Sequence, residues 1–527
     1  MSILEQPATG ADRAPYKNEP LTDFSQPKNR LAMEAALAKV ASQLGQTLHP
    51  VVGGKKLESD KFLNSYNPAR PDELIARFYS ATSDQAEQAV QVASETFKTW
   101  QKVPYTERAE YLFKAADLMR ERKHEFSAWM VFEIGKNWNE ADADTAEAID
   151  FLEFYAREML RLGGPQPVVQ VEGEKNHLAY VPLGVGVVIP PWNFPLAITT
   201  GMTSAAIVTG NTVILKPSSV TPVIAYRLFE LFEEVGLPAG VFNFLPGSGG
   251  AIGDLLVDHP KTRFISFTGS KEVGLRIFDR ASKTAPGQIW LKRTVLEMGG
   301  KDSVVVDETA DLNAAASAIV TSAFGFQGQK CSAGSRAILV DSIYDEVLEK
   351  VVEKVNKLEL GPTDEKNFDM GPVSDEKAYK KINEYIEIGK GEGKLVAGDK
   401  NAVPETGYFI PPTVFSEVDP QARIAQEEIF GPVLAVIRAR DFDHALEIAN
   451  GTEYGLTGAL FSQDPARLDR AETEFHVGNL YFNRKCTGAL VGVQPFGGFN
   501  MSGTDSKAGG QDYLLLFLQG KSIARRS

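Results

Sequence analysis

A short polar segment, residues 325–336, contains Cys331, one of only two cysteines in a chain of 527 residues. A free cysteine is often just a small buried hydrophobic residue. Here glycine, glutamine, lysine and serine surround the sulfur, and so turn-prone a segment is a poor core filler. Lys330, next to the sulfur, is expected to favour the thiolate, which is the form that attacks. The segment therefore indicates a cysteine nucleophile.

The flanks of this segment predict that the thiol lies on a loop. Residues 313–324 form a helix-like run of small residues, and residues 337–340 form a strand-like run. Loops held by a rigid scaffold are where catalytic groups concentrate. Glu297 lies 34 residues before Cys331 and precedes Met298 and two glycines. That carboxylate is either part of a simple turn or a base that works with the cysteine.

The composition is that of a large globular enzyme. Hydrophobic residues make up 43% and charged residues 24% of the chain, and its length suggests about three domains. The net charge of −14 argues against nucleic-acid binding. No apolar run reaches the ~18 to 20 residues of a membrane helix, so no membrane association is expected.

The cysteine and histidine content bears on disulfides, metal binding and cellular location. Two cysteines cannot build a disulfide framework, and the six histidines show no metal-ligand spacing, so no metal is expected. The N-terminal segment contains acidic residues and lacks the apolar core of a secretory signal. A cytoplasmic location follows as an expectation.

The elements that must position the cysteine follow an α/β pattern. Residues 83–162 carry apolar side chains at helical spacing. Four apolar runs then alternate with helical stretches, at residues 185–189, 212–215, 241–245 and 263–267. This alternation predicts a doubly wound parallel sheet, which binds ligands beyond the carboxyl ends of its strands. A second series spans residues 303–493, and the edge-like segments 168–180 and 514–522 are candidates for pairing as strands.

A dinucleotide fingerprint of the GxGxxG type is missing after these strands. The nearest match, Gly247-x-Gly249-Gly250, is weak evidence by itself. Gly269 and Ser270 end one strand and open the helix at residues 271–281, so they offer backbone N–H groups and a hydroxyl to a pyrophosphate. An ordinary helix N-cap explains the same pair equally well.

Five motifs, in a fixed order around Cys331, identify a family. They are Pro191-Trp192-Asn193-Phe194-Pro195, Phe267-Thr268-Gly269-Ser270, Glu297-Met298-Gly299-Gly300-Lys301, Glu428-Ile429-Phe430-Gly431-Pro432 and Pro495-Phe496-Gly497-Gly498. From about Asn64 to the C-terminus, the chain resembles the aldehyde dehydrogenase superfamily.

The resemblance implies an α/β protein with the aldehyde dehydrogenase fold. Its parts would be a Rossmann-like cofactor domain, an α/β catalytic domain and a small β oligomerisation element, in a homo-oligomer. The expected boundaries are an N-terminal arm at 1–40, an NAD-binding domain at 41–164 and 182–297, a catalytic domain at 298–495, and oligomerisation strands at 165–181 and 510–527.

The resemblance also implies the chemistry. Cys331 would attack an aldehyde, and the Asn193 side chain with the Cys331 backbone N–H would stabilise the oxyanion. Glu297 would then activate water to hydrolyse the thioester. A cysteine hydrolase without a cofactor is the alternative of another class, but it needs a histidine base, and none stands in a recognisable motif near Cys331.

NAD is the cofactor that the resemblance implies. The expected binding residues are Pro191, Trp192, Lys216, Ser219, Gly249, Gly269, Ser270, Gly299, Glu428 and Phe430. Among them, Lys216 would bind the adenosine ribose and Ser270 the pyrophosphate, while Glu428 and Phe430 would lie at the nicotinamide end. Ser219 stands where many NAD-selective relatives have a glutamate, whose carboxylate would repel a 2′-phosphate. The absence of this glutamate leaves NADP open as a secondary cofactor.

Three narrower motifs resemble the branch of the superfamily that oxidises L-glutamate γ-semialdehyde. They are Gln329-Lys330-Cys331-Ser332-Ala333, Lys485-Cys486-Thr487-Gly488-Ala489 and Phe499-Asn500-Met501-Ser502-Gly503-Thr504. The branch implies an upstream proline dehydrogenase as a candidate partner. Another semialdehyde is the alternative substrate.

The same resemblance assigns the substrate contacts. Lys330, Ser332 and the backbone at Gly488 and Ala489 would hold the α-carboxylate, while Phe194 and Phe496 would bracket the aliphatic chain. Glu147 is either a residue near the substrate entrance or a solvated helix charge. Cys486 is interpreted as a packing residue of the carboxylate loop, the alternative being a second nucleophile.

Overall fold

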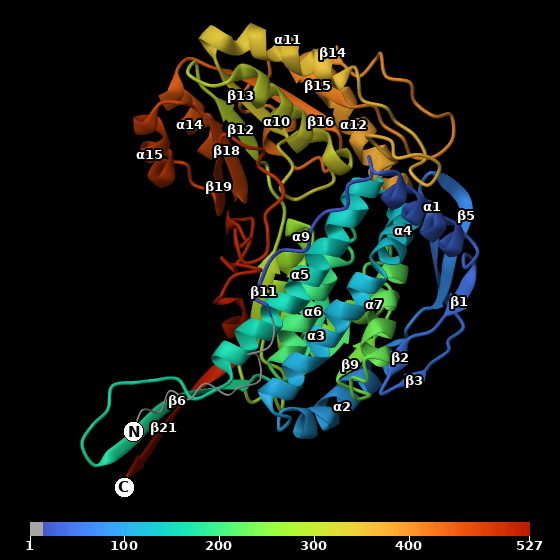
Figure 1. The fold of residues 1–527 in the computed structure, drawn as a ribbon, viewed down its shortest axis with the longest axis vertical. Helices are drawn as coiled ribbons and strands as arrows, with labels where there is room; N and C mark the ends of the chain where they lie inside the picture. Colours follow the sequence, from blue (N-terminus) through green and yellow to red (C-terminus); the bar gives the residue numbers. More distant parts are fainter. Residues whose placement is uncertain (1–13, 527) are drawn as a thin grey trace.

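The computed structural model describes residues 14–526, and the N-terminal part of the predicted arm, residues 1–13, lies outside the described residues, as does residue 527. Two α/β bodies lie one above the other, and a two-stranded ribbon projects from the lower one (Figure 1). The predicted α/β class is confirmed. None of the helices in the described range is long and apolar enough to cross a membrane.

The first body is built on a seven-stranded sheet with the order β11-β10-β7-β8-β9-β2-β3. Its strands are β2 (Val51–Val52), β3 (Lys55–Lys56), β7 (Val185–Ile189), β8 (Thr212–Leu215), β9 (Phe242–Phe244), β10 (Thr262–Thr268) and β11 (Arg293–Glu297). The first five strands in that order are parallel, and β2 joins them antiparallel to β9. All four apolar runs of the sequence pattern therefore become neighbouring parallel strands.

Helices cover both faces of this sheet. They are α2 (Ser83–Trp100), α3 (Tyr105–Glu121), α4 (Lys123–Ile134), α5 (Trp138–Leu162), α6 (Ala197–Val208), α7 (Pro222–Glu234), α8 (Asp254–Asp258) and α9 (Lys271–Ala281). Side chains alternate along each strand, so Val188 faces the core shared with α3 to α7, whereas Val187 faces the core under α2. Helices α8 and α9 pack on each other over the edge of the sheet formed by β10 and β11.

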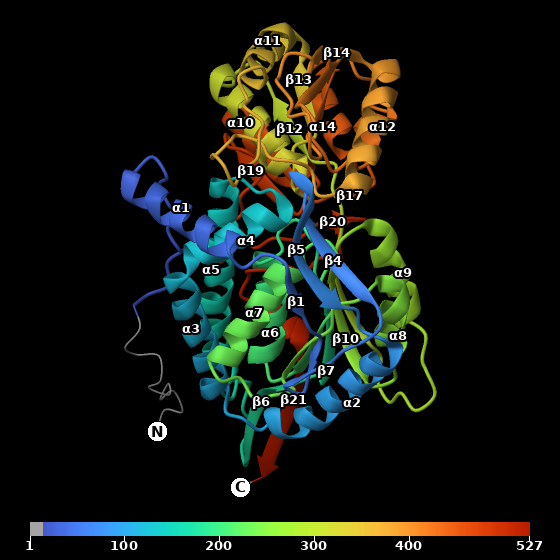
Figure 2. The ribbon, with the colours of Figure 1, turned by 90° about the vertical axis from the view of Figure 1, so that its right-hand side faces the viewer.

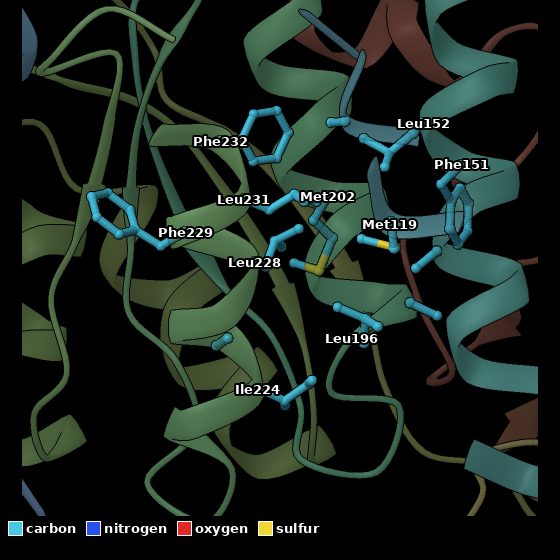
Figure 3. Packing of buried hydrophobic residues seen from close by; sticks show 14 of the residues in the cluster. Met119, Phe151, Leu152, Leu196, Met202, Ile224, Leu228, Phe229, Leu231 and Phe232 are labelled. Atoms are coloured by element: carbon cyan, nitrogen blue, oxygen red, sulfur yellow. The ribbon is translucent and has the colours of Figure 1, made fainter. Parts of the chain in front are cut away.

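The larger core lies between the sheet and the helices α3 to α7. Figure 3 shows Met119, Phe151, Leu152, Leu196, Met202, Ile224, Leu228, Phe229, Leu231 and Phe232 packed in this layer. Close packing of so many large apolar side chains makes the layer a rigid support. It fixes α5 and α6, whose ends carry groups of the site.

A smaller sheet and an N-terminal helix flank this layer. The sheet has the order β1-β5-β4, formed by β1 (Gln46–Leu48), β4 (Phe62–Asn67) and β5 (Arg70–Tyr79). Helix α1 (Pro27–Ala41) packs against α4 through Met33, Leu37 and Val40 (Figure 2). The segment before α1, residues 14–26, is called the arm below.

The second body has a seven-stranded sheet with the order β14-β15-β16-β13-β12-β18-β19. Its strands are β12 (Ser303–Val306), β13 (Arg336–Val340), β14 (Lys394–Ala397), β15 (Thr413–Ser416), β16 (Val433–Ala439), β18 (Thr457–Phe461) and β19 (Asn479–Phe482). Its helices are α10 (Leu312–Phe324), α11 (Tyr344–Val355), α12 (Glu376–Glu392), α13 (Arg423–Gln426), α14 (Phe442–Asn450) and α15 (Pro465–Glu474). Helices α10 and α11 cover one face, and α12 to α15 cover the other.

The projecting ribbon pairs two distant segments. Strand β6 (Glu174–Pro182) runs antiparallel to β21 (Leu518–Arg526), from Leu518 opposite Pro182 to Arg526 opposite Glu174 (Figure 1). The predicted pairing is confirmed, but both strands begin and end later than the segments 168–180 and 514–522 that the sequence suggested. A short pair, β17 (Tyr454–Gly455) with β20 (Phe499–Asn500), lies where the C-terminal part of the chain returns toward the first body.

Candidate active site

The carboxyl ends of the parallel strands in the first sheet gather most of the predicted cofactor residues. In the sheet, β8 and β9 follow β7 on one side, whereas β10 and β11 follow on its other side. The strand order therefore reverses between β7 and β10. Such a switch point is where ligands bind in doubly wound sheets. Pro191, Trp192, Asn193 and Phe194 follow β7; Lys216 and Ser219 follow β8; Gly249 follows β9; Gly269 and Ser270 follow β10; Glu297 and Gly299 lie at the end of β11.

Cys331 lies on the loop before β13, as the sequence predicted. Phe326, Gln327 and Gly328 precede it with φ values of 48°, 57° and 66°. Left-handed backbone at two non-glycine residues is costly, and such strain persists only where the surroundings enforce it. Here the Gln327 amide donates to the Pro372 carbonyl at 2.7 Å, and the Gln329 side chain accepts the Ser374 N–H at 2.9 Å. The loop is held in one conformation.

Asn193 joins the two bodies at this loop. Its buried side chain donates from Nδ2 to the carbonyl oxygen of Gln329 at 3.0 Å. An asparagine amide carries two N–H donors, so this bond leaves one for another acceptor. The side chain from the end of β7 is thereby fixed two residues from Cys331.

The charges around Cys331 differ from the sequence-based expectation. Burial raises the pKa of the thiol well above its usual value, and the carboxylates of Asp302, Glu428 and Glu297 raise it further. The expectation that Lys330 favours the thiolate is wrong, because its ammonium donates to Glu140 Oε1 at 2.7 Å. This environment therefore favours the protonated thiol, and a base that takes its proton is expected at the site.

Glu297 has the environment of such a base. Burial raises the pKa of its carboxyl to about 8. One oxygen, Oε1, accepts the Ser506 hydroxyl, while Oε2 is buried without a hydrogen-bond partner among residues 14–526. A carboxylate with a raised pKa and a free oxygen can take a proton near neutral pH.

Two glycines bring the cysteine loop and Glu428 close to the end of β11. The N–H of Gly300 donates to Glu428 Oε1 at 3.0 Å. A Cβ at Gly299 would lie 2.5 Å from the Glu428 carboxylate, and one at Gly300 would lie 2.5 Å from the Cys331 carbonyl oxygen. Only glycine permits both approaches.

Phe430, two residues after Glu428, lies between the two bodies. Its backbone has a φ of 60°, which is uncommon for a bulky residue. Its ring meets that of Trp192 edge to face at 5.3 Å. A residue from the second body thus packs on one that follows β7 in the first.

Lys216 fits the adenosine end of a nicotinamide dinucleotide. Its side chain is buried, and burial lowers the pKa of its ammonium to about 8. Within the described part of the chain its ammonium has one hydrogen-bond acceptor, the Pro217 carbonyl at 3.2 Å. A buried ammonium is costly without acceptors, and ribose hydroxyls would supply them.

The turns after β9 and β10 differ in the contacts that their residues make. Ser270 caps α9 by accepting the Val273 N–H at 3.4 Å, so the ordinary N-cap is present. Ser270 is also exposed, so the N-terminus of α9 is accessible to a ligand. Gly269 donates its N–H to the Glu297 carbonyl at 3.0 Å. Around Gly249, no atom of residues 14–526 outside its chain neighbours lies within 4 Å of a built Cβ. Packing thus does not require a glycine there.

Four of the predicted substrate residues come from three segments of the second half of the chain. Gly488, in the left-handed region with a φ of +78°, and Ala489 lie on the loop after β19, whose Gly488 carbonyl accepts Arg484 at 3.0 Å. Ser332 follows the cysteine and is buried. Phe496 is fixed by reciprocal backbone hydrogen bonds with Ala508 at 2.8 Å.

A buried ion network beneath Phe194 escaped the sequence analysis. Lys136 donates to Asp144 Oδ2 at 2.9 Å, and both side chains are 0% exposed. The Lys136 ammonium also lies 4.1 Å from the Phe194 ring centre and 4.5 Å from that of Phe326, in cation–π geometry. Burial alone would raise the pKa of Glu140, but ammonium groups, above all that of Lys330, lower it.

The signal for this network is present in α5. Glu140, Asp144 and Glu147 are spaced four and three residues apart, which places three carboxylates on one helix face. Burial, with the Asp144 charge nearby, raises the pKa of Glu147 to about 8. Glu147 is partly buried, which favours a residue near the substrate site over a fully solvated helix charge.

Cys486 is a packing residue in this geometry. Its side chain is fully buried in the core under α10, and its thiol donates to the Ser332 carbonyl at 3.4 Å. It supports the backbone next to Cys331 from below. No group of three His, Cys, Asp or Glu side chains within residues 14–526 is placed to hold a metal ion.

A switch-point sheet edge that faces a loop-borne cysteine and a buried carboxylate defines a class of nucleotide-dependent enzymes. The family comparison identifies that class, because residues 56–523 match the model of the aldehyde dehydrogenase family. The chain belongs to the aldehyde dehydrogenase family.

Individual relatives are similar over almost the whole chain. The 1-pyrroline-5-carboxylate dehydrogenase of Geobacillus sp. (strain WCH70) is 61% identical over 511 residues, covering 97% of this chain and 99% of that protein. The structure of 1-pyrroline-5-carboxylate dehydrogenase from Thermus with bound NAD has a TM-score of 0.96 and 53% identity, covering 98% of this chain and 100% of that one. Proline utilization A from Bdellovibrio bacteriovorus has a TM-score of 0.96 and 46% identity, covering 97% of this chain and 53% of that one.

Proposed function

We propose that the protein oxidises L-glutamate γ-semialdehyde, the open form of 1-pyrroline-5-carboxylate, to L-glutamate with NAD. The observation that carries the proposal is the approach of the end of β11 to the cysteine loop, where a Cβ at Gly300 would lie 2.5 Å from the Cys331 carbonyl oxygen. The Glu297 carboxylate at that strand end raises the pKa of the Cys331 thiol. The close similarity to 1-pyrroline-5-carboxylate dehydrogenases over 97% of the chain supports this substrate.

The first step is attack by Cys331 on the aldehyde carbon. Its proton passes to Glu297 Oε2, directly or through one water, because that oxygen has no other partner among residues 14–526. The carbonyl π electrons move to oxygen, and the oxyanion accepts the second N–H of Asn193 and the backbone N–H of Cys331. Loss of one such donor typically costs about 2.7 to 4 kcal/mol in the barrier.

Oxidation then converts the adduct to a thioester. Lys216, Ser270 and Glu428 would hold NAD, together with the other strand-end residues predicted for it: Pro191, Trp192, Ser219, Gly249, Gly269, Gly299 and Phe430. When bound there, NAD supplies the oxidising power by accepting the hydride from the former aldehyde carbon. The role of the chain is to hold the adduct and to exclude water until the thioester has formed.

Hydrolysis completes the turnover. Glu297 first releases to solvent the proton that it took from the thiol, and then takes a proton from water; the hydroxide adds to the thioester carbon, and the C–S bond breaks. The sulfur leaves as the thiolate and takes the proton back from Glu297, while the carboxylic acid loses its proton to solvent and leaves as a carboxylate. A glutamate placed to activate water favours this hydrolytic course over transfer of the acyl group to another acceptor.

The substrate carboxylate is recognised mainly by uncharged hydrogen-bond donors. The Lys330 ammonium is shared with Glu140 at 2.7 Å, so one of its three N–H groups is already engaged. The Ser332 hydroxyl and the N–H groups of Gly488 and Ala489 supply the remaining donors. Phe194 and Phe496 flank the aliphatic chain, and Glu147 lines the entrance.

A cysteine hydrolase finds no support at this thiol. The charged groups that act on Cys331 are the carboxylates of Asp302, Glu428 and Glu297, and a hydrolase of this kind needs a histidine base. For the dehydrogenase, the deciding measurement is a steady-state panel of aldehydes with NAD and NADP. Glutamate γ-semialdehyde should exceed acetaldehyde and succinic semialdehyde strongly in kcat/KM, and equal rates on all three would refute the assignment.

The assembly and setting follow from separate observations. We propose a homo-oligomer joined through β6 and β21, because this ribbon projects from the body and Val169 beside it is 92% exposed (Figure 1). A proline-oxidising enzyme is the proposed source of substrate, since the chain resembles about half of proline utilization A. Both cysteines are free thiols, which is consistent with the cytoplasm as the proposed location.

A further inference from the structure

The arm, residues 14–26, reaches the loop that carries Gly488 and Ala489. The Tyr16 hydroxyl donates to the Val491 carbonyl at 3.0 Å, and Asn18 Nδ2 donates to the same oxygen at 2.9 Å. These contacts join positions 475 and 473 residues apart. One carbonyl, two residues beyond Ala489, thus accepts two side-chain donors from the other end of the chain.

The arm is itself fixed to α5 at this point. Asn18 Nδ2 also donates to Asp150 Oδ2 at 2.8 Å, and the Glu19 N–H donates to Asp150 Oδ1 at 2.7 Å. The Glu19 carboxylate in turn accepts Arg120 of α3 at 2.8 Å. Asp150 is buried, so its charge is stabilised by the arm that covers it. The residues that contact Val491 are therefore anchored to the helix layer through α5 and α3.

Aromatic packing closes the same junction. The Tyr16 ring meets Phe154 of α5 edge to face at 5.3 Å. Gly492, with a φ of +76°, follows Val491, and a Cβ there would lie 3.0 Å from Phe154 and 3.1 Å from Tyr16. A glycine, which has no Cβ, therefore fits at position 492, where the arm, α5 and the loop meet.

The far side of the loop has its own support. The Gly492 N–H donates to the Gly509 carbonyl at 2.8 Å, and the Gly509 N–H donates to the Tyr155 hydroxyl at 2.9 Å. Other polar contacts, such as Leu490 N–H to the Gln494 side chain at 2.9 Å, stay within the loop. The arm is thus the support that bears directly on the Val491 carbonyl, beside the residues assigned to the substrate carboxylate.

We propose that Tyr16 and Asn18 are positioning residues for recognition of the substrate carboxylate. They hold Val491 and thereby the N–H groups of Gly488 and Ala489 in the orientation that a carboxylate needs. Pre-organised donors bind without an ordering cost, and a loosened loop must be ordered by each substrate molecule. This role rests on the proposed function, because it presumes a substrate with a carboxylate.

The test is the double variant Tyr16→Phe/Asn18→Ala in the full chain. With glutamate γ-semialdehyde its KM should rise about tenfold, as expected for two lost hydrogen bonds. The KM for NAD and kcat/KM for propanal, which has no carboxylate, should stay at wild-type values. Asn29→Ala is the matched control, because Asn29 donates its amide to the Asp23 carbonyl at 2.9 Å, away from the loop. Tyr16→Phe alone keeps the ring and is the variant to use if the double variant folds poorly.

Hydrogen exchange of residues 488–494 gives a second readout that does not depend on turnover. Exchange should be faster in the double variant and unchanged in Asn29→Ala. Unchanged exchange, or a KM that rises equally for both aldehydes, would overturn the positioning role. Failure of the wild-type enzyme to oxidise glutamate γ-semialdehyde would instead refute the proposed function, whatever the exchange result.

Discussion

Replacement of Lys136 by methionine tests the buried network under Phe194. Methionine keeps the length and apolar stem of the lysine but removes its charge, which lies 2.9 Å from Asp144 Oδ2 with both side chains fully buried. Breaking a buried ion pair by removing one partner typically costs about 3 to 5 kcal/mol, since the other charge stays uncompensated. The second oxygen of Asp144 accepts the Ala197 N–H at 2.6 Å, so the carboxylate cannot turn away without releasing the start of α6.

The free energy of unfolding in urea should therefore fall by about 3 to 5 kcal/mol in Lys136→Met. In the double variant Lys136→Met/Asp144→Asn no buried charge is left unpaired at these two positions, and part of that loss, about 0.5 to 3 kcal/mol, should be recovered. The pH dependence has a definite sign. Burial already raises the pKa of Asp144, and without Lys136 its charged form is disfavoured further. The deficit should thus shrink as pH falls, because protonation removes the unpaired charge.

Function should respond in the same variant. The Lys136 ammonium lies 4.1 Å from the Phe194 ring centre, so its loss frees the ring that we propose to flank the substrate chain. We expect a higher KM for the semialdehyde in Lys136→Met with little change in the KM for NAD. Wild-type stability in the single variant, or a double variant no more stable than the single one, would refute the reasoning.

The remaining predictions concern the reacting groups and the cofactor. Glu297→Gln should slow both the formation and the hydrolysis of the acyl-enzyme, followed by mass spectrometry in single turnover, and in the wild type hydrolysis should rise with pH through about 8 as the Glu297 carboxyl ionises; a hydrolysis rate that is flat with pH would count against Glu297 as the base. Asn193→Ala should lower kcat/KM about a hundredfold to a thousandfold, and a loss below tenfold would exclude it from the oxyanion site. Ser219→Glu should raise the KM for NADP more than that for NAD, since the new carboxylate repels a 2′-phosphate. Cys486→Ala should keep acyl-enzyme formation and lose stability, whereas Cys331→Ala should abolish the acyl-enzyme; the reverse result would exchange their roles.

The sheet edge proposed to bind NAD was predictable because its signals are local. Runs such as residues 212–215 are short, apolar and followed by polar turns, and each became a buried strand with the expected residues at its carboxyl end. Periodicity and turn chemistry are properties of neighbouring residues, so one sequence carries them. The family motifs then added the roles of Cys331, Glu297 and Asn193, which no local pattern contains.

The electrostatics of the site were not predictable in the same way. Lys330 is adjacent to Cys331 in sequence, yet its ammonium binds Glu140, 190 residues away. The groups that do act on the thiol, Asp302, Glu428 and Glu297, come from distant segments. Their effect depends on burial, which follows only from the packed bodies.

The site exists only where the two bodies meet, and this explains why stability and recognition share residues. Asn193 reaches from the first sheet to the Gln329 carbonyl of the second body at 3.0 Å, and Gly299 and Gly300 let the two backbones approach. The substrate loop after β19 belongs to the second body by its strand, but Tyr16 and Asn18 fasten it to α5 of the first. A shift between the bodies would therefore move the oxyanion donor and the carboxylate donors together. Variants along this junction should change the KM for the semialdehyde before they change the KM for NAD, whose predicted residues lie mainly on the first sheet.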